Sequence, residues 1–165
     1  MKNELIAIIL ILLILSIFGC TSNQSQSDSK IYGSTYVNFQ MPNGWEIHPM
    51  PGNGTVIWMK EDPRIRITEI KDKQKYDLNY NNALKTDKDM YTVITGNKNI
   101  NGITVNFVKT MSNKEGNIQD EYFFSKNNKY YNLEGWAYTG WNPQNQTSDR
   151  KKIDKAVETI INTID

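Results

Sequence analysis

The sequence predicts an α+β fold, in which an antiparallel β-sheet ending in a C-terminal meander is flanked by two helices. Three observations support this class. Several short segments alternate apolar and polar residues, which is the period of a half-buried strand. Two longer segments repeat their apolar residues every three or four positions, which is the period of a helix. The last four strand-like segments follow one another through short connections, and strands joined in that way are antiparallel.

The first half of the sheet is predicted from four short segments. Residues 37–41 alternate apolar and polar side chains, and a second short strand begins at residue 45 after a Pro-Asn-Gly turn. Residues 55–60 and 64–70 form two more strands, separated by the turn signal Glu61-Asp62-Pro63. This part of the chain therefore contributes strands but no helix.

The first helix is predicted over residues 77–90, with Asp77 as its N-cap. Its apolar face is thin and consists of residues at helical spacing: Tyr76, Tyr80, Ala83, Leu84 and Tyr91.

The meander that follows is predicted from its turns. Asn101-Gly102 suits a two-residue turn in which both residues have positive φ, and Asn127-Asn128 makes a second one. The four strands are residues 91–100, 103–111, 118–126 and 129–138.

A final helix is predicted to begin at the N-cap Ser148, with Asp149 near its positive end. One stripe of this helix is apolar and packs on the sheet: Ile153, Val157, Ile160, Ile161 and Ile164. Ala156 would let the helix approach the sheet closely.

Composition limits the class of protein. The chain has 165 residues, a net charge of +1 and 11% aromatic residues, a combination that excludes disorder and predicts one domain. Within the first 20 residues, Leu5 to Phe18 is apolar except for Ser16, too short for a membrane span but suited to a signal peptide. We therefore predict a signal peptide at 1–19, a Ser-rich flexible tether at 20–34 and a domain at 35–165.

Gly19-Cys20 resembles the end of a lipoprotein signal peptide, and Cys20 is the chain's one cysteine. The resemblance implies that the Cys20 sulfur carries a diacylglyceryl group that anchors the protein in membrane lipid. The alternative is an unmodified thiol at the end of an uncleaved anchor. Both interpretations put the domain at the outer face of the cytoplasmic membrane.

The domain resembles the PsbP-like family through four features. These are the N-terminal segment Phe39-Gln-Met-Pro-Asn-Gly-Trp45, a middle helix, the meander within 103–138 and an Ile-rich terminal helix. The resemblance covers about residues 35–165 and implies an α/β/α sandwich with no common catalytic activity. Members mostly bind other proteins or help them assemble, and they include small lipoproteins of bacteria and methanogenic archaea. The abundance of Lys, Ile and Asn is compatible with an archaeal source.

Residues for catalysis or for metal and cofactor binding are scarce, so we predict no enzyme, no metal and no cofactor. His48 is the single histidine, and we expect it on the surface in a loop. No phosphate-binding loop or nucleic-acid footprint is present. Three acidic pairs are expected to be solvent-exposed: Glu61-Asp62, Asp87/Asp89 and Asp120-Glu121. A basic stretch is expected on a solvated edge strand or, alternatively, against anionic headgroups: Arg64, Arg66, Lys71, Lys73 and Lys75.

Aromatic residues mark the candidate binding surface, which we predict from Tyr130, Trp136, Tyr138 and Trp141. The alternative is that these rings form the core, since the domain has few aliphatic residues. N-glycosylation sequons in predicted loops stand at Asn53 and Asn145, and a further one at Asn23.

Three functions remain open. The first is a non-catalytic, membrane-anchored domain that binds a protein partner or assists assembly of an envelope complex. The second is a small-molecule or carbohydrate binding module around Trp136 and Trp141. The third, a hydrolase, lacks a recognisable nucleophile–base pair.

Overall fold

The fold is described by a computed structural model that covers residues 31–33, 37–48, 55–59 and 62–165. Its centre is a seven-stranded sheet in which neighbouring strands are antiparallel, in the order β3-β4-β5-β9-β8-β7-β6. Its first three strands are β3 (Glu46–His48), β4 (Thr55–Trp58) and β5 (Arg64–Ile70). The predicted α+β class is confirmed.

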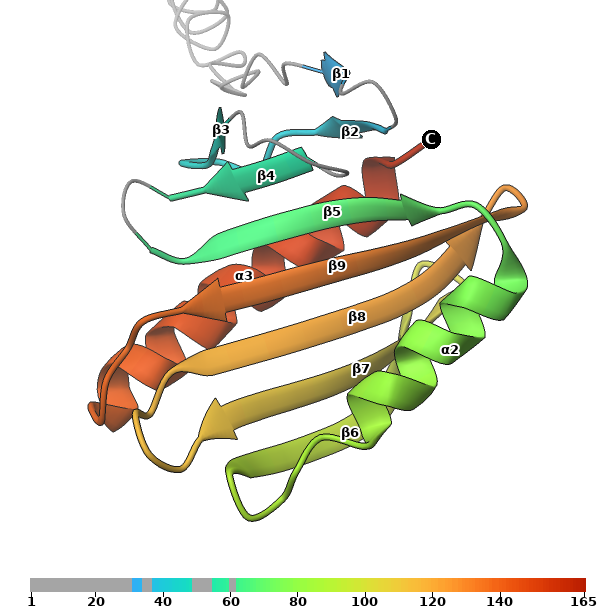
Figure 1. The fold of residues 1–165 in the computed structure, drawn as a ribbon. Helices are drawn as coiled ribbons and strands as arrows, with labels where there is room; N and C mark the ends of the chain where they lie inside the picture. The colour runs from blue at the N-terminus through green and yellow to red at the C-terminus, as the bar shows by residue number, and fades with distance from the viewer. Residues whose placement is uncertain (1–30, 34–36, 49–54, 60–61) are drawn as a thin grey trace, which may run out of the picture.

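The predicted meander is confirmed strand by strand. It comprises β6 (Tyr91–Ile100), β7 (Ile103–Ser112), β8 (Ile118–Lys126) and β9 (Lys129–Ala137). Asn101 and Gly102 have φ values of 47° and 86°, so the Asn-Gly turn has the conformation that the sequence predicts. After the meander, β9 pairs with β5 and so joins the two halves of the sheet (Figure 1).

The two helices lie on opposite faces of the sheet, α2 in front and α3 behind in Figure 1. Helix α3 (Pro143–Thr163) buries the predicted stripe, and Ile153, Val157 and Ile160 have no exposed surface. Helix α2 (Lys73–Leu84) packs through Tyr76, Tyr80 and Ala83 on a smaller apolar cluster.

Both predicted helix starts are wrong, because each helix begins earlier in the chain than predicted. Helix α2 begins after the N-cap Asp72, whose carboxylate accepts a hydrogen bond from Lys75 N at 2.6 Å, and it ends at Leu84. Helix α3 begins after the N-cap Asn142, with Pro143 in its first turn. In α3 the first turns are polar and lie before the apolar stripe, so the periodicity did not reveal them. In α2 the stripe already begins at Tyr76 in the first turn, and the error was the choice of Asp77 as the N-cap.

The first two strands stand apart from the main sheet. β1 (Ile31–Gly33) pairs with β2 (Asn38–Gln40), and β1 falls in the stretch for which the sequence predicts a tether. Phe39 is buried, and Gln40 N donates a hydrogen bond to Thr163 Oγ1 at 2.9 Å, which attaches β2 to the end of α3. None of the helices in the described part of the chain is apolar and long enough to span a membrane.

Candidate functional site

Helix α2 covers only part of its face of the sheet. Its aromatic side chains contact Phe123 in β8 and Tyr130 at the start of β9, with ring centroids of Tyr76 and Tyr130 5.2 Å apart. The region of the same face over β4, β5 and the end of β9 lies beyond the helix (Figure 1). Large side chains in that region are therefore half-exposed rather than buried.

Six side chains of this region, five of them half-exposed and Tyr138 exposed, form what we call the Trp–Arg face: Trp58, Arg64, Arg66, Glu134, Trp136 and Tyr138. The strand register brings the first five together, because Arg64 lies opposite both Trp58 and Trp136, and Arg66 lies opposite Glu134. Paired residues of neighbouring strands share a face, so these side chains point the same way. Tyr138 follows β9 directly.

Each arginine of the Trp–Arg face lies over an indole ring. The guanidinium carbon of Arg64 is 4.9 Å from the Trp58 ring centroid and 5.9 Å from that of Tyr138. The guanidinium carbon of Arg66 is 5.6 Å from the Trp136 centroid. These distances fall within the range of cation–π attraction, which restricts the rotamers of both partners.

Glu134 is held from both sides. Gln119 Nε2 donates a hydrogen bond to Glu134 Oε1 at 3.0 Å, and Arg66 Nη1 lies 3.5 Å from Glu134 Oε2. Arg64 Nε lies 3.7 Å from a carboxylate oxygen of Asp62. The charges of the Trp–Arg face are thus nearly balanced, and each of its two arginines has a carboxylate within 3.7 Å.

A groove of about 310 Å³ opens beside Trp136. Arg66, Trp136 and Tyr138 line one part of it, and the loop after β7 contributes Glu115 and Asn117. Gln146 Nε2 donates to the carbonyls of Gly116 and Gly140, at 3.0 and 2.9 Å, which ties that loop to the turn before α3. The groove therefore has a rigid rim with both aromatic and polar groups.

The structure brings together two of the four residues predicted for the binding surface. Trp136 and Tyr138 line the groove, and Tyr138 is 66% exposed. Tyr130 does not join them: it packs on Tyr76 and lies six residues from Trp136 along β9, or roughly 20 Å. Trp141 is 60% exposed in the turn before α3 and does not line the groove.

Trp58, Arg64 and Arg66 were not predicted as part of this surface. The prediction that the arginines lie on an edge strand is wrong, because β5 is internal, between β4 and β9. The alternation of Arg and Ile in β5 did place both arginines on one face. The alternation could not show that β5 pairs with β9, because the paired residues are more than 60 positions apart in the chain.

Other predicted sites lie elsewhere or outside the described residues. His48 is half-buried in β3, not in a loop, and its ring packs on Trp58. Asn145 is exposed in the first turn of α3 instead of in a loop. Cys20, Asn23 and Asn53 lie outside the described residues. Among the residues that the structure describes, no group of three or more His, Cys, Asp or Glu side chains could hold a metal ion.

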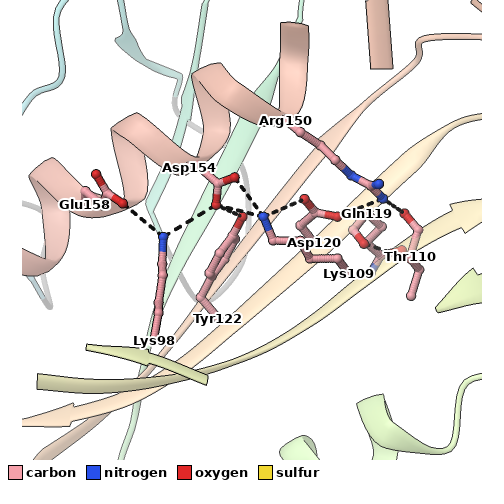
Figure 2. Close-up of polar contacts among 9 residues, drawn as sticks. All are labelled: Lys98, Lys109, Thr110, Gln119, Asp120, Tyr122, Arg150, Asp154 and Glu158. Atoms are coloured by element: carbon pink, nitrogen blue, oxygen red, sulfur yellow. Dashed lines mark hydrogen bonds and ion pairs between the residues drawn. The ribbon is translucent and has the colours of Figure 1, made fainter. Parts of the chain in front are cut away.

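A second polar cluster lies on the opposite face, between α3 and strands β6–β8 (Figure 2). Asp120 Oδ1 is 3.3 Å from Arg150 Nη2, and Asp120 Oδ2 is 3.9 Å from Lys109 Nζ. Lys109 Nζ also donates to both carboxylate oxygens of Asp154 at 2.8 Å. The prediction that Asp120 is solvent-exposed is wrong, because its side chain is completely buried beneath α3.

The other acidic residues that were predicted to be solvent-exposed differ from one another: Asp62 and Glu121 are half-buried instead, and Glu61 lies outside the described residues. Asp87 and Asp89 are exposed as predicted, but they lie in the turn after α2, where Asp87 Oδ1 accepts a hydrogen bond from Asp89 N at 2.9 Å. Glu121 lies on the α2 face and accepts a hydrogen bond from Asn132 Nδ2 at 3.0 Å. As expected for neighbours in a strand, Asp120 and Glu121 point to opposite faces.

Burial raises the pKa values of the two aspartates of this cluster, whereas the positive charges nearby lower them. Burial raises the pKa of Asp120 to about 6, although Arg150 and Lys109 both lower it. Burial also acts to raise the pKa of Asp154, but the hydrogen bond and charge of Lys109 outweigh it and leave that pKa below its usual value. Burial raises the pKa of Tyr122, whose hydroxyl donates to Asp154 Oδ1 at 3.0 Å. The cluster joins α3 to the sheet through ion pairs and hydrogen bonds.

No protein-family model and no curated protein matches the sequence. Among solved structures, the chain is similar to the solution structure of cyanobacterial PsbP (CyanoP) from Synechocystis, with 13% identity and a TM-score of 0.49 over 78% of this chain and 88% of that one. It is also similar to a crystal structure from Bacteroides thetaiotaomicron, with 12% identity and a TM-score of 0.48 over 82% of this chain. The match spans 46% of the Bacteroides chain, less than half its length.

Proposed function

We propose that this protein is a PsbP-like lipoprotein at the outer face of the cytoplasmic membrane, anchored through Cys20, whose non-catalytic domain binds a protein partner through the Trp–Arg face. The observation that carries this proposal is the part of the sheet that α2 leaves uncovered. Two indoles and two guanidinium groups gather there on adjacent strands instead of being covered by a second helix.

The chemistry of the Trp–Arg face suits a protein partner. Trp, Tyr and Arg are the residue types that dominate binding energy in protein interfaces. The cation–π contacts and the hydrogen bond from Gln119 to Glu134 restrict these side chains in the free protein, which lowers the entropy lost on binding. The near balance of charge disfavours a nucleic acid as the partner.

The experiment is a pulldown of the full chain from native membranes, with Trp136→Ala as the test variant. Trp141→Ala is the matched control, because Trp141 is an exposed tryptophan that does not line the groove. We expect one stoichiometric partner with the wild type and the control, and its loss with Trp136→Ala. Equal capture by all three proteins, or no partner at all, would contradict the proposal.

The groove beside Trp136 supports a second candidate, a small-molecule or carbohydrate binding module. Its combination of Trp136 and Tyr138 with Glu115 and Asn117 offers rings for stacking and groups for hydrogen bonds. This candidate predicts a ligand-dependent rise in melting temperature that disappears in Trp136→Ala and remains in Trp141→Ala.

Anchoring through Cys20 is tested independently of binding. Each buried methylene contributes about 0.8 kcal/mol to membrane affinity, so two acyl chains would hold the protein without a transmembrane helix. We expect Cys20→Ser to leave an uncleaved precursor without lipid, seen by intact mass. Processing and membrane retention like the wild type would exclude the lipoprotein assignment.

A further inference from the structure

The outer edge of β6 is the longest edge of the sheet. β6 has ten residues, whereas β3 at the opposite edge has three. Among the strands that the structure describes, β6 has β7 on one side and no neighbour on the other (Figure 1). Its outward backbone groups are thus available to pair with another strand.

The Asn101-Gly102 turn determines which backbone groups point outward. In a hairpin with a two-residue turn, the flanking pair Ile100 and Ile103 exchange both hydrogen bonds, and the bonded residues then alternate along the strand. The residues that direct N–H and C=O away from β7 are therefore Val93, Thr95, Asn97 and Asn99, together with Tyr91. Tyr91 N already donates to Asp87 O at 3.0 Å, so the available edge begins after it.

This edge lacks the usual protection against pairing. β6 contains no proline, and Lys98 is its one charged residue. Lys98 points toward α3, where its Nζ lies 3.1 Å from Glu158 Oε1 (Figure 2). Natural edge strands are commonly protected by charges, prolines or bulges, so a long neutral edge favours a partner strand.

The side chains of β6 favour a second copy of the same strand. Ile94 is 51% exposed and lies on the α3 face, two residues from Gly96. The ring of Phe107 lies against Gly96, where an added Cβ would meet Phe107 Cζ at 2.7 Å. A partner that places an isoleucine opposite Gly96 would cover this ring.

One antiparallel register places an isoleucine of each copy opposite Gly96 of the other. With Thr95 opposite Thr95 of the second copy, Ile94 of each chain lies opposite Gly96 of the other. Val93 then pairs with Asn97, and the outward backbone groups of both strands pair with one another. Lys98 lies opposite Thr92, so no like charges meet, and paired threonines are favourable across strands.

We propose that two copies of this chain associate through β6, antiparallel and with Thr95 on the twofold axis, so that their sheets become continuous. Ile94 of each copy packs over Gly96 and against the Phe107 ring of the other. This surface is separate from the Trp–Arg face, so self-association and partner binding can be tested independently.

The register is tested by disulfide formation in the full chain, solubilised in detergent. In Thr95→Cys, the two new thiols belong to directly opposed residues with Cα atoms roughly 5.5 Å apart, within disulfide range. In the control Asn97→Cys they lie four residues apart along the strands, roughly 13 Å, and cannot join. Peptide mapping separates these links from any that involve Cys20.

We expect Thr95→Cys to give a linked dimer and Asn97→Cys to give none. Adding Ile94→Lys to Thr95→Cys should abolish the link while the circular dichroism spectrum stays unchanged, because Ile94 is half-exposed in the single chain. Wild-type chain should show twice the protomer mass by light scattering, and Ile94→Lys should show the protomer mass. A wild-type chain that scatters as a protomer, a link to a different protein, or equal linking of both cysteine variants would overturn the proposal.

Discussion

Asp120 and Arg150 form an ion pair at 3.3 Å in which the carboxylate is completely buried and the guanidinium is partly exposed. Arg150 Nη2 also donates to Thr110 O at 2.7 Å, so the arginine joins α3 to both β7 and β8. The pair does not fully compensate for the burial of the acid, since the pKa of Asp120 remains raised to about 6. The Asp120 carboxyl group therefore binds a proton more tightly in the folded state than in the unfolded state.

That preference predicts a specific pH dependence of stability. Because the folded pKa of Asp120 lies above its unfolded value, its contribution to stability is complete below about pH 4 and is lost as the pH rises through about 6. A shift from 3.8 to about 6 corresponds to roughly 3 kcal/mol. Asp120→Asn removes this contribution, so we expect the variant to gain roughly that amount relative to the wild type between pH 4 and pH 7.

Urea denaturation at several pH values measures this difference. Asp89→Asn is the control, because it removes one carboxylate at an exposed position far from the cluster in sequence. Asp154 acts in the opposite direction, since its lowered pKa contributes stability that is lost as the pH falls. Parallel pH profiles for wild type and Asp120→Asn would show that the Asp120 carboxyl is not shifted.

Gly135 in β9 lies directly against Ile153 of α3. An added Cβ would be 2.6 Å from Ile153 Cγ2, and Ile153 is completely buried, so the Ile153 side chain or the helix that carries it would have to shift. Overpacking of this kind costs about 1–3 kcal/mol. We expect Gly135→Ala to lower the free energy of unfolding by that amount in urea denaturation.

The double variant Gly135→Ala/Ile153→Ala tests the cause. Ile153→Ala alone should cost about 2–5 kcal/mol because it leaves a cavity, but in the double variant the new methyl group occupies part of that space. The losses in free energy of unfolding of the two single variants should therefore sum to more than the loss in the double variant. Strict additivity would mean that the methyl group does not meet Ile153.

The sequence predicted those parts of the fold that depend on local information. The two-residue turns at Asn101 and Asn127 determine the meander, and the isoleucine stripe determines which face of α3 is buried. The start of α3 was missed because Asn142 caps polar turns that carry no apolar period, and the start of α2 because the N-cap is Asp72 and not Asp77. Periodicity finds the buried part of a helix and not its solvated beginning.

The Trp–Arg face and the Asp120 cluster depend on contacts between segments far apart in the chain, and the sequence predicted these contacts less well. Trp136 and Tyr138 stood out because they are close together in the chain, which also drew Tyr130 into the predicted surface. Trp58 and Arg66 reach Trp136 only through the pairing of β5 with β4 and β9. Asp120 looked like an ordinary strand carboxylate because its partner Arg150 lies 30 residues further along the chain, on α3.

Ile160 lies completely buried on the predicted stripe of α3. Burying an isoleucine contributes about 1.5–3 kcal/mol, and a carboxylate in its place would add the cost of burying a polar or charged group. Since domains are stable by only about 5–15 kcal/mol, Ile160→Asp should abolish the cooperative melting transition seen by circular dichroism. Lys155→Asp, at an exposed position of the same helix, should keep that transition. An Ile160→Asp variant that melts like the wild type would contradict the packing of α3 on the sheet.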